Sequence, residues 1–89
     1  MTRHISRRER WDRQGTDRYR SADGLVVYRK KGEWWAEVAY QVLPAEAPTW
    51  QSFSDRLGPF RRPRNAMVEA ERHATLLRNR HGDHVRFGA

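Results

Sequence analysis

Three basic side chains, Arg61, Arg62 and Arg64, surround Pro63 at the predicted start of a helix. Proline suits the first turn of a helix, because the N–H that it lacks would have no helical partner there. The positive end of the helix dipole normally favours acidic side chains, so three cations at this position are unusual. Backbone amides and guanidinium groups are both donors and can converge on a phosphate group. We therefore predict an anion site here; the alternative interpretation is an ordinary solvated turn.

A second basic group, Arg29, Lys30 and Lys31, precedes Gly32 in a predicted hairpin loop. A basic loop beside a basic helix end would form a patch able to follow a phosphate backbone. Trp35 lies on the predicted polar face of the next strand, where it could stack on a base or fill a pocket in a protein partner. The alternative for Trp35 is that the N-terminal segment covers it.

The composition points to a polyanionic partner. The chain of 89 residues has a net charge of +7, and 16 of its 18 basic residues are Arg. Such a balance favours nucleic acid, acidic protein surfaces or anionic lipid, although an Arg excess also arises from coding bias. No apolar run approaches the roughly 18 residues that span a bilayer, the N-terminus lacks an apolar signal region, and the sequence contains no Cys. We predict a cytoplasmic protein with no membrane partner.

Residue types that could support catalysis or metal binding are poorly spaced. The run His81–His84 has ligand types for zinc, but it lacks the i, i+4 helical spacing and a further ligand. Glu33 and Glu37 share one strand face about 13 Å apart by strand rise, which is too far for a carboxylate pair. There is no glycine-rich phosphate loop. We predict that the protein is not an enzyme and has no catalytic residue, metal or cofactor.

The elements that would position the basic groups follow from two periodicities. Apolar and polar residues alternate from Glu33 to Leu43, which predicts a strand with one buried face. Shorter strands are predicted at Leu25–Arg29 and about Thr49–Arg56, and an amphipathic helix at Arg64–Arg80. The buried stripe of this helix should consist of Met67, Ala70, Ala74 and Leu77. The predicted fold class is α+β: a three-stranded antiparallel β-sheet packed against one C-terminal amphipathic α-helix (β-β-β-α), within residues 24–84.

The two ends of the chain are predicted to lie outside this domain. Residues 1–23 form a basic polar N-terminal extension, in which a capping-box pattern at Ser6 could begin a short helix from about Arg7 to Gln14. Such a helix would need Trp11 to dock on the domain, and the alternative is a disordered extension. Residues 85–89 form a C-terminal tail that either pairs as an edge strand or frays.

Three strands followed by a helix with a basic entry resemble the second half of the double-stranded-RNA-binding domain. Here Gly58-Pro59-Phe60-Arg61-Arg62-Pro63-Arg64-Asn65-Ala66 would take the place of that family's Gly- and Lys-rich entry to its last helix. The order of elements is also similar to the three-stranded DNA-reading modules of some integrases and plant transcription factors. The family's lysine motif is missing, so the resemblance is one of architecture and implies nucleic-acid binding only by analogy.

These patterns predict a small basic non-enzymatic binding module that contacts the phosphates of DNA or RNA. The predicted nucleic-acid-binding residues are Arg29, Lys30, Lys31, Trp35, Arg61, Arg62 and Arg64. The alternative is a protein-interaction or self-associating module. In that case the polar sheet face and an open strand edge would contact a protein partner or a second copy of the chain.

Overall fold

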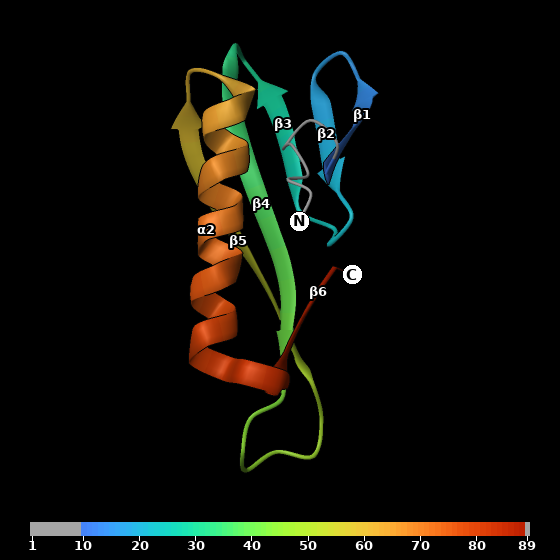
Figure 1. The fold of residues 1–89 in the computed structure, drawn as a ribbon, viewed down its shortest axis with the longest axis vertical. Coiled ribbons are helices and arrows are strands. Elements are labelled where there is room, and N and C mark those ends of the chain that lie inside the picture. The colour runs from blue at the N-terminus through green and yellow to red at the C-terminus, as the bar shows by residue number, and fades with distance from the viewer. Residues whose placement is uncertain (1–9, 89) are drawn as a thin grey trace, which may run out of the picture.

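Residues 10–88 are described by a computed structural model, in which one antiparallel sheet carries a long helix on one face (Figure 1). The strands are β1 (Trp11–Gly15), β2 (Arg18–Ser21), β3 (Val26–Lys30), β4 (Glu33–Val42), β5 (Gln51–Phe60) and β6 (Val85–Phe87), and the helix is α2 (Pro63–His81). A single 3-10 turn, Gly82–His84, joins α2 to β6. The class is α+β, as the sequence predicts.

Strand β4 organises the sheet because its backbone pairs along both edges. Strand β5 pairs with it from Trp34 to Val42 on one edge. On the other edge β3 pairs with the first half of β4 and β6 with the second half, so β3 and β6 lie end to end. The sheet continues from β3 through β2 to β1, which leaves β1 and β5 as the outermost strands.

The hydrophobic core lies between α2 and one face of the sheet. Strand β4 contributes Trp34, Ala36 and Val38, which alternate with residues on the opposite face. The buried residues of α2 are Ala66, Met67, Ala70, Ala74 and Leu77. Small side chains at three of these positions let the helix approach the sheet closely, as the dense packing of protein interiors requires. The predicted helix stripe and the buried face of the alternating strand are both confirmed.

The prediction of a three-stranded sheet is wrong, because the sheet has six strands. Two of the additional strands, β1 and β2, occupy a segment assigned to the N-terminal extension, and Trp11 is buried in the core rather than on a short helix. The rest of that predicted helix, before Arg10, lies outside the described residues. Strand β6 adds the third. Strands β1 and β2 are short and carry few apolar residues, so no alternating pattern marks them. The pairing of β6 with β4 agrees with the edge-strand alternative for residues 85–89.

The third predicted strand is longer than expected, because β5 continues through Gly58 and Pro59 to Phe60. Proline fits there since β5 is an edge strand and needs no ladder donor on its outer side. The pairing with β4 shifts register between Trp34 and Ala36, which accommodates the irregular backbone. Phe60 then packs against the core beside Trp34.

Two adjacent leucines of α2 offer a direct test of this packing. Leu77 is 5% exposed and Leu76 is 58% exposed. Leu77→Ala should lower the free energy of unfolding by about 2–5 kcal/mol, because it removes buried methyl groups and leaves a cavity. Leu76→Ala, the matched control, should change it by less than about 0.5 kcal/mol. Urea denaturation of both variants measures the difference; equal effects would contradict the placement of the helix.

Candidate nucleic-acid interface

Both predicted basic groups lie at the same end of the domain. Strand β4 begins where β5 ends, as the pairs Lys30 with Glu33 and Trp34 with Phe60 show. The turn between β3 and β4 and the connection from β5 to α2 are therefore neighbours, and the turn between β1 and β2 lies at this end too (Figure 1). We call the exposed side chains of Arg29, Lys30, Lys31, Arg61, Arg62 and Arg64 the basic end.

The start of α2 within the basic end has no side-chain cap. Arg62 occupies the N-cap position in an extended conformation, and Pro63 follows as the first helical residue. The amide of Ala66 donates to the carbonyl of Arg62 at 3.4 Å. The amides of Arg64 and Asn65 have no carbonyl partner in the preceding turn of the helix, and the first turn contains no acidic residue. This geometry leaves donors and guanidinium groups available to an anion.

Few carboxylates offset the charge of the basic end. The carboxylate of Asp17, in the turn between β1 and β2, lies 3.9 Å from the guanidinium of Arg29. The backbone carbonyl of Asp17 also accepts a hydrogen bond from the backbone amide of Arg29. Within residues 10–88, the other five cations of the basic end form no ion pair with a carboxylate. Acidic groups elsewhere pair with other arginines, such as Arg72 with Glu69 at 3.2 Å. The positive charge of the basic end is therefore largely uncompensated by ion pairs within these residues.

The turn between β3 and β4 places Lys31 in an uncommon backbone conformation. Lys31 has φ of 52° and Gly32 has φ of 79°, so both central residues are left-handed. This geometry suits the twist of a hairpin, but Asn or Asp usually precedes the Gly. A Lys there is strained by on the order of 1 kcal/mol, and strained residues are found disproportionately at binding sites.

Trp35 lies on the sheet face away from α2 rather than within the basic end. Its ring is packed over Gly58 of β5, where an added Cβ would come within 2.9 Å of the ring atom Cε3. The guanidinium carbon of Arg56 lies 4.9 Å from the ring centroid. The alternative that the N-terminal segment covers Trp35 is wrong for Trp11 and Tyr19 of that segment, because both lie on the face that packs against α2. Trp35 remains half-buried and reachable from solvent.

A group of titratable side chains joins α2 to the sheet away from the basic end. His73 lies with Nε2 2.8 Å from Oδ2 of Asp55 on β5. Burial raises the pKa of Tyr40, and a hydrogen bond to Asp55 adds to the shift. These groups hold the middle of the helix against β4 and β5, which gives them a structural role. On the same helix Glu69 pairs with Arg72, whereas His73 contacts Asp55.

The structure also bears on metal and membrane contacts. Within residues 10–88, no three His, Cys, Asp or Glu side chains gather as a metal site would require. His81 and His84 lie at the end of α2 and in the 3-10 turn that follows it. No helix of the described part is long and apolar enough to cross a membrane. The predictions of no enzyme activity, no cofactor and a cytoplasmic location stay predictions.

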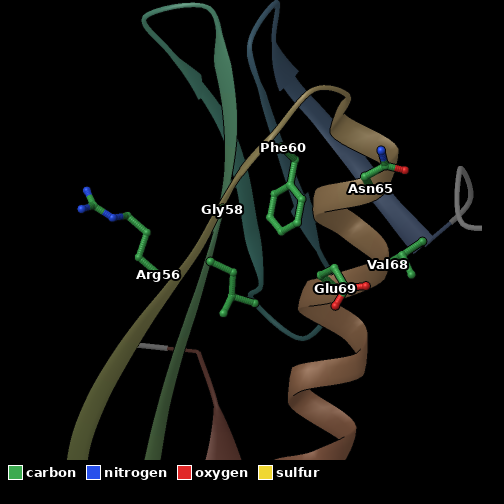
Figure 2. A pocket seen from close by; sticks show the side chains of 7 residues that line it. Arg56, Gly58, Phe60, Asn65, Val68 and Glu69 are labelled. Carbon is green, nitrogen blue, oxygen red and sulfur yellow. The ribbon is translucent and has the colours of Figure 1, made fainter.

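A cleft of about 570 Å³ opens between β5 and the first half of α2 (Figure 2). It is lined by Arg56, Leu57, Gly58, Phe60, Asn65, Val68 and Glu69. Figure 2 shows Phe60 and Glu69 within the cleft, whereas Arg56 extends away from α2. The cleft runs along the outer edge of the sheet, so an added strand could reach both the β5 backbone and these side chains.

Comparison of the chain with protein-family models, with curated proteins and with solved structures finds no match. The resemblance to the double-stranded-RNA-binding domain is further weakened by the fold itself, because five strands rather than three precede α2. The site must therefore be judged on its own geometry.

Sequence reasoning missed four side chains on the same face as Trp35, namely Arg18, Arg20, Arg56 and Arg86. Arg56 could have been assigned there, because alternation along the third predicted strand puts it opposite Glu37. Arg18 and Arg20 fell in a segment with no predicted strand, and Arg86 lies in a strand of only three residues. For these three no periodic signal was present.

Two glycines test whether the Trp35 ring lies against β5. Gly58 and Gly15 both have a positive φ, of 132° and 153°, but only Gly58 has a ring against its Cα. Each Ala substitution adds backbone strain of about 1–3 kcal/mol. Gly58→Ala should lose about 1 kcal/mol or more beyond Gly15→Ala, because the Trp35 ring must move. Denaturation measures the stability, and the NMR signal of the Trp35 indole N–H should shift in Gly58→Ala alone.

Proposed function

We propose that this protein is a small non-enzymatic nucleic-acid-binding module whose basic end contacts phosphate groups. The observation that carries the proposal is the convergence at one end of two basic segments that lie about thirty residues apart in the sequence. Five of their six cations have no ion-pair partner within the described chain, and three of these five flank an uncapped helix start. Phosphate oxygens are acceptors that match both the free amides and the guanidinium groups.

The strained turn gives independent support. A sequence selected only for stability would place Asn or Gly at position 31, where both tolerate a left-handed backbone. The chain instead has a lysine there, with φ of 52°, so an exposed cation occupies the strained position of this turn. A strained backbone at a charged residue such as Lys31 is consistent with a contact between its side chain and a ligand.

A second candidate function is favoured by the open edge of β5. This ten-residue strand has no neighbour on its outer side within the described sheet, and the cleft beside it could receive side chains of an added strand. Such an edge supports pairing with a protein partner or a second copy. The two functions differ in salt dependence: phosphate contacts weaken steeply with salt, whereas strand addition depends mainly on protein concentration.

Charge removal at the basic end tests the proposed function. Arg61→Ala with Arg62→Ala should weaken binding to labelled duplex and single strands, and the salt slope between about 50 and 200 mM should fall by about 0.7–0.9 for each lost phosphate contact. Fluorescence anisotropy measures affinity and slope.

The control is Arg72→Ala with Arg80→Ala, which removes the same charge from exposed positions further along α2. Equal losses in both pairs would show that only net charge matters. In backbone NMR of the unmutated protein, amide signals that stay fixed from Arg61 to Ala66 at low salt would exclude the site.

Lys31→Asn separates binding from stability. Asn tolerates the left-handed backbone, so the free energy of unfolding of this variant should be about 0.5–1 kcal/mol higher than that of the original protein. It should nevertheless bind nucleic acid more weakly, because a phosphate contact is lost. Lys30→Asn, in the regular strand, is the control: it should weaken binding without the gain in stability. Thermal melts and anisotropy titrations report both properties, and unchanged affinity in Lys31→Asn would remove Lys31 from the site.

A further inference from the structure

The sheet face opposite α2 carries an organised set of polar and aromatic side chains. Along β4 this face contains Trp35, Glu37, Ala39 and Gln41, which alternate with the core residues. The helix lies in front of the sheet in Figure 1, on the other side from these residues. No helix of the described chain covers this face, so we call it the open face.

Two arginine–tryptophan pairs stand on the open face. The guanidinium of Arg56 lies 4.9 Å from the ring centroid of Trp35, and that of Arg86 lies 4.2 Å from the ring centroid of Trp50. Arg86 pairs in register with Gln41 and donates a hydrogen bond to its side chain. Each pair presents a flat, cationic surface on which a base can stack, since bases stack on both aromatic rings and guanidinium planes.

The two pairs are spaced along the strand direction. Trp35 and Gln41, which marks the position of the second pair, are six residues apart on β4, or about 20 Å by strand rise. Two side-chain hydrogen bonds join β4 to β5 along this length: Gln41 donates to Ser52 at 3.1 Å, and Ser54 donates to Glu37 at 2.9 Å. Tyr28, opposite Trp35 on β3, adds a third aromatic side chain beside the Arg56–Trp35 pair. The spacing leaves room for several nucleotides of an extended strand.

The charge of the open face complements a polyanion. Four arginines project from it, against the carboxylates of Asp12 and Glu37. These arginines are Arg18, Arg20, Arg56 and Arg86. The face also continues into the basic end, because Trp35 lies only two residues beyond the turn between β3 and β4. A second copy packed face to face would set guanidinium groups against guanidinium groups, which disfavours self-association here.

We propose that the open face binds single-stranded nucleic acid, with bases stacked at the Arg56–Trp35 and Arg86–Trp50 pairs and phosphates led into the basic end. This proposal rests on the proposed function and specifies its ligand. A duplex keeps its bases stacked inside and offers only phosphates and groove edges, so it cannot use the two platforms. A single strand can use both platforms and the basic end together, and should therefore bind more tightly.

The experiment compares a labelled oligothymidylate of about 12 nucleotides with a duplex of the same length, a size within the range that one small domain covers. Anisotropy is followed at about 50 and 200 mM salt. The single strand should bind at least about tenfold more tightly, and it should quench tryptophan fluorescence. Trp35→Ala and Trp50→Ala should each weaken single-strand binding about tenfold while leaving duplex binding unchanged.

The matched control is Phe53→Ala, which removes an aromatic ring that is 44% exposed on the opposite face of the same sheet. It should leave single-strand binding unchanged. Because Trp35→Ala can loosen the contact with Gly58, the variants Arg56→Gln and Arg86→Gln repeat the test with less change in packing. They should also weaken single-strand binding more than duplex binding.

The outcomes separate this proposal from the proposed function. Equal affinity for single strand and duplex, with losses only at Arg61 and Arg62, overturns the open-face proposal and leaves the basic end intact. Absence of binding to either probe at low salt overturns both. A concentration-dependent dimer that Trp35→Ala abolishes also overturns the open-face proposal, because it assigns that face to a second copy.

Discussion

Three alanines of α2 share a core with Trp34, Ala36 and Val38 of β4, and the rest of the structure depends on this contact between helix and sheet. The small side chains of the three alanines and of Ala36 let the two backbones lie close without a void. Within residues 10–88 a single helix covers one face of the sheet, so the side chains that alternate with those core positions must tolerate water. The opposite face is consequently free to carry Trp35, Gln41 and their arginine neighbours without loss of the core.

Antiparallel pairing decides which parts of the chain become neighbours. Since β5 runs antiparallel to β4, it ends where β4 begins, and the entry to α2 returns to the turn that follows β3. Two basic segments that are remote in sequence thus meet at one end. The same geometry explains the short C-terminal strand: α2 runs back along the sheet, and β6 then fills the length of β4 that β3 leaves unpaired.

The sequence predicted the elements that bury a face and missed those that do not. The alternation of β4 and the stripe of α2 are strong because each follows the period of its element over many residues. Strands β1 and β2 carry few buried side chains, and pairing with a neighbour, rather than a local pattern, makes them strands. For β6 the sequence left an edge strand and a frayed tail as alternatives, and pairing with β4 decides between them. Mispredicting β1 also misplaced Trp11, whose burial in the core reflects tertiary contact with α2 through Glu71.

The candidate site divides in the same way. The composition of the two basic segments could be read directly, but their meeting required the topology of β4 and β5. Trp35 was correctly placed on the polar face by alternation, whereas its stacking with Arg56 needed the register of β5 against β4. Trp50 precedes the first residue of β5, so its pairing with Arg86 joins two segments that no local pattern connects.

The distribution of ion pairs links the charge of the molecule to its stability. Arg10 with Glu71, Arg72 with Glu69 and Arg78 with Asp23 all involve α2 beyond its first turn. None of these pairs includes a cation of the basic end, where water and salt screen the repulsion between like charges. Repulsion of this kind opposes the folded state, which a core of this size can tolerate only while the charges stay exposed. The charges that oppose folding are thus the ones that a bound polyanion would neutralise, so ligand binding and stability would be coupled at the same surface.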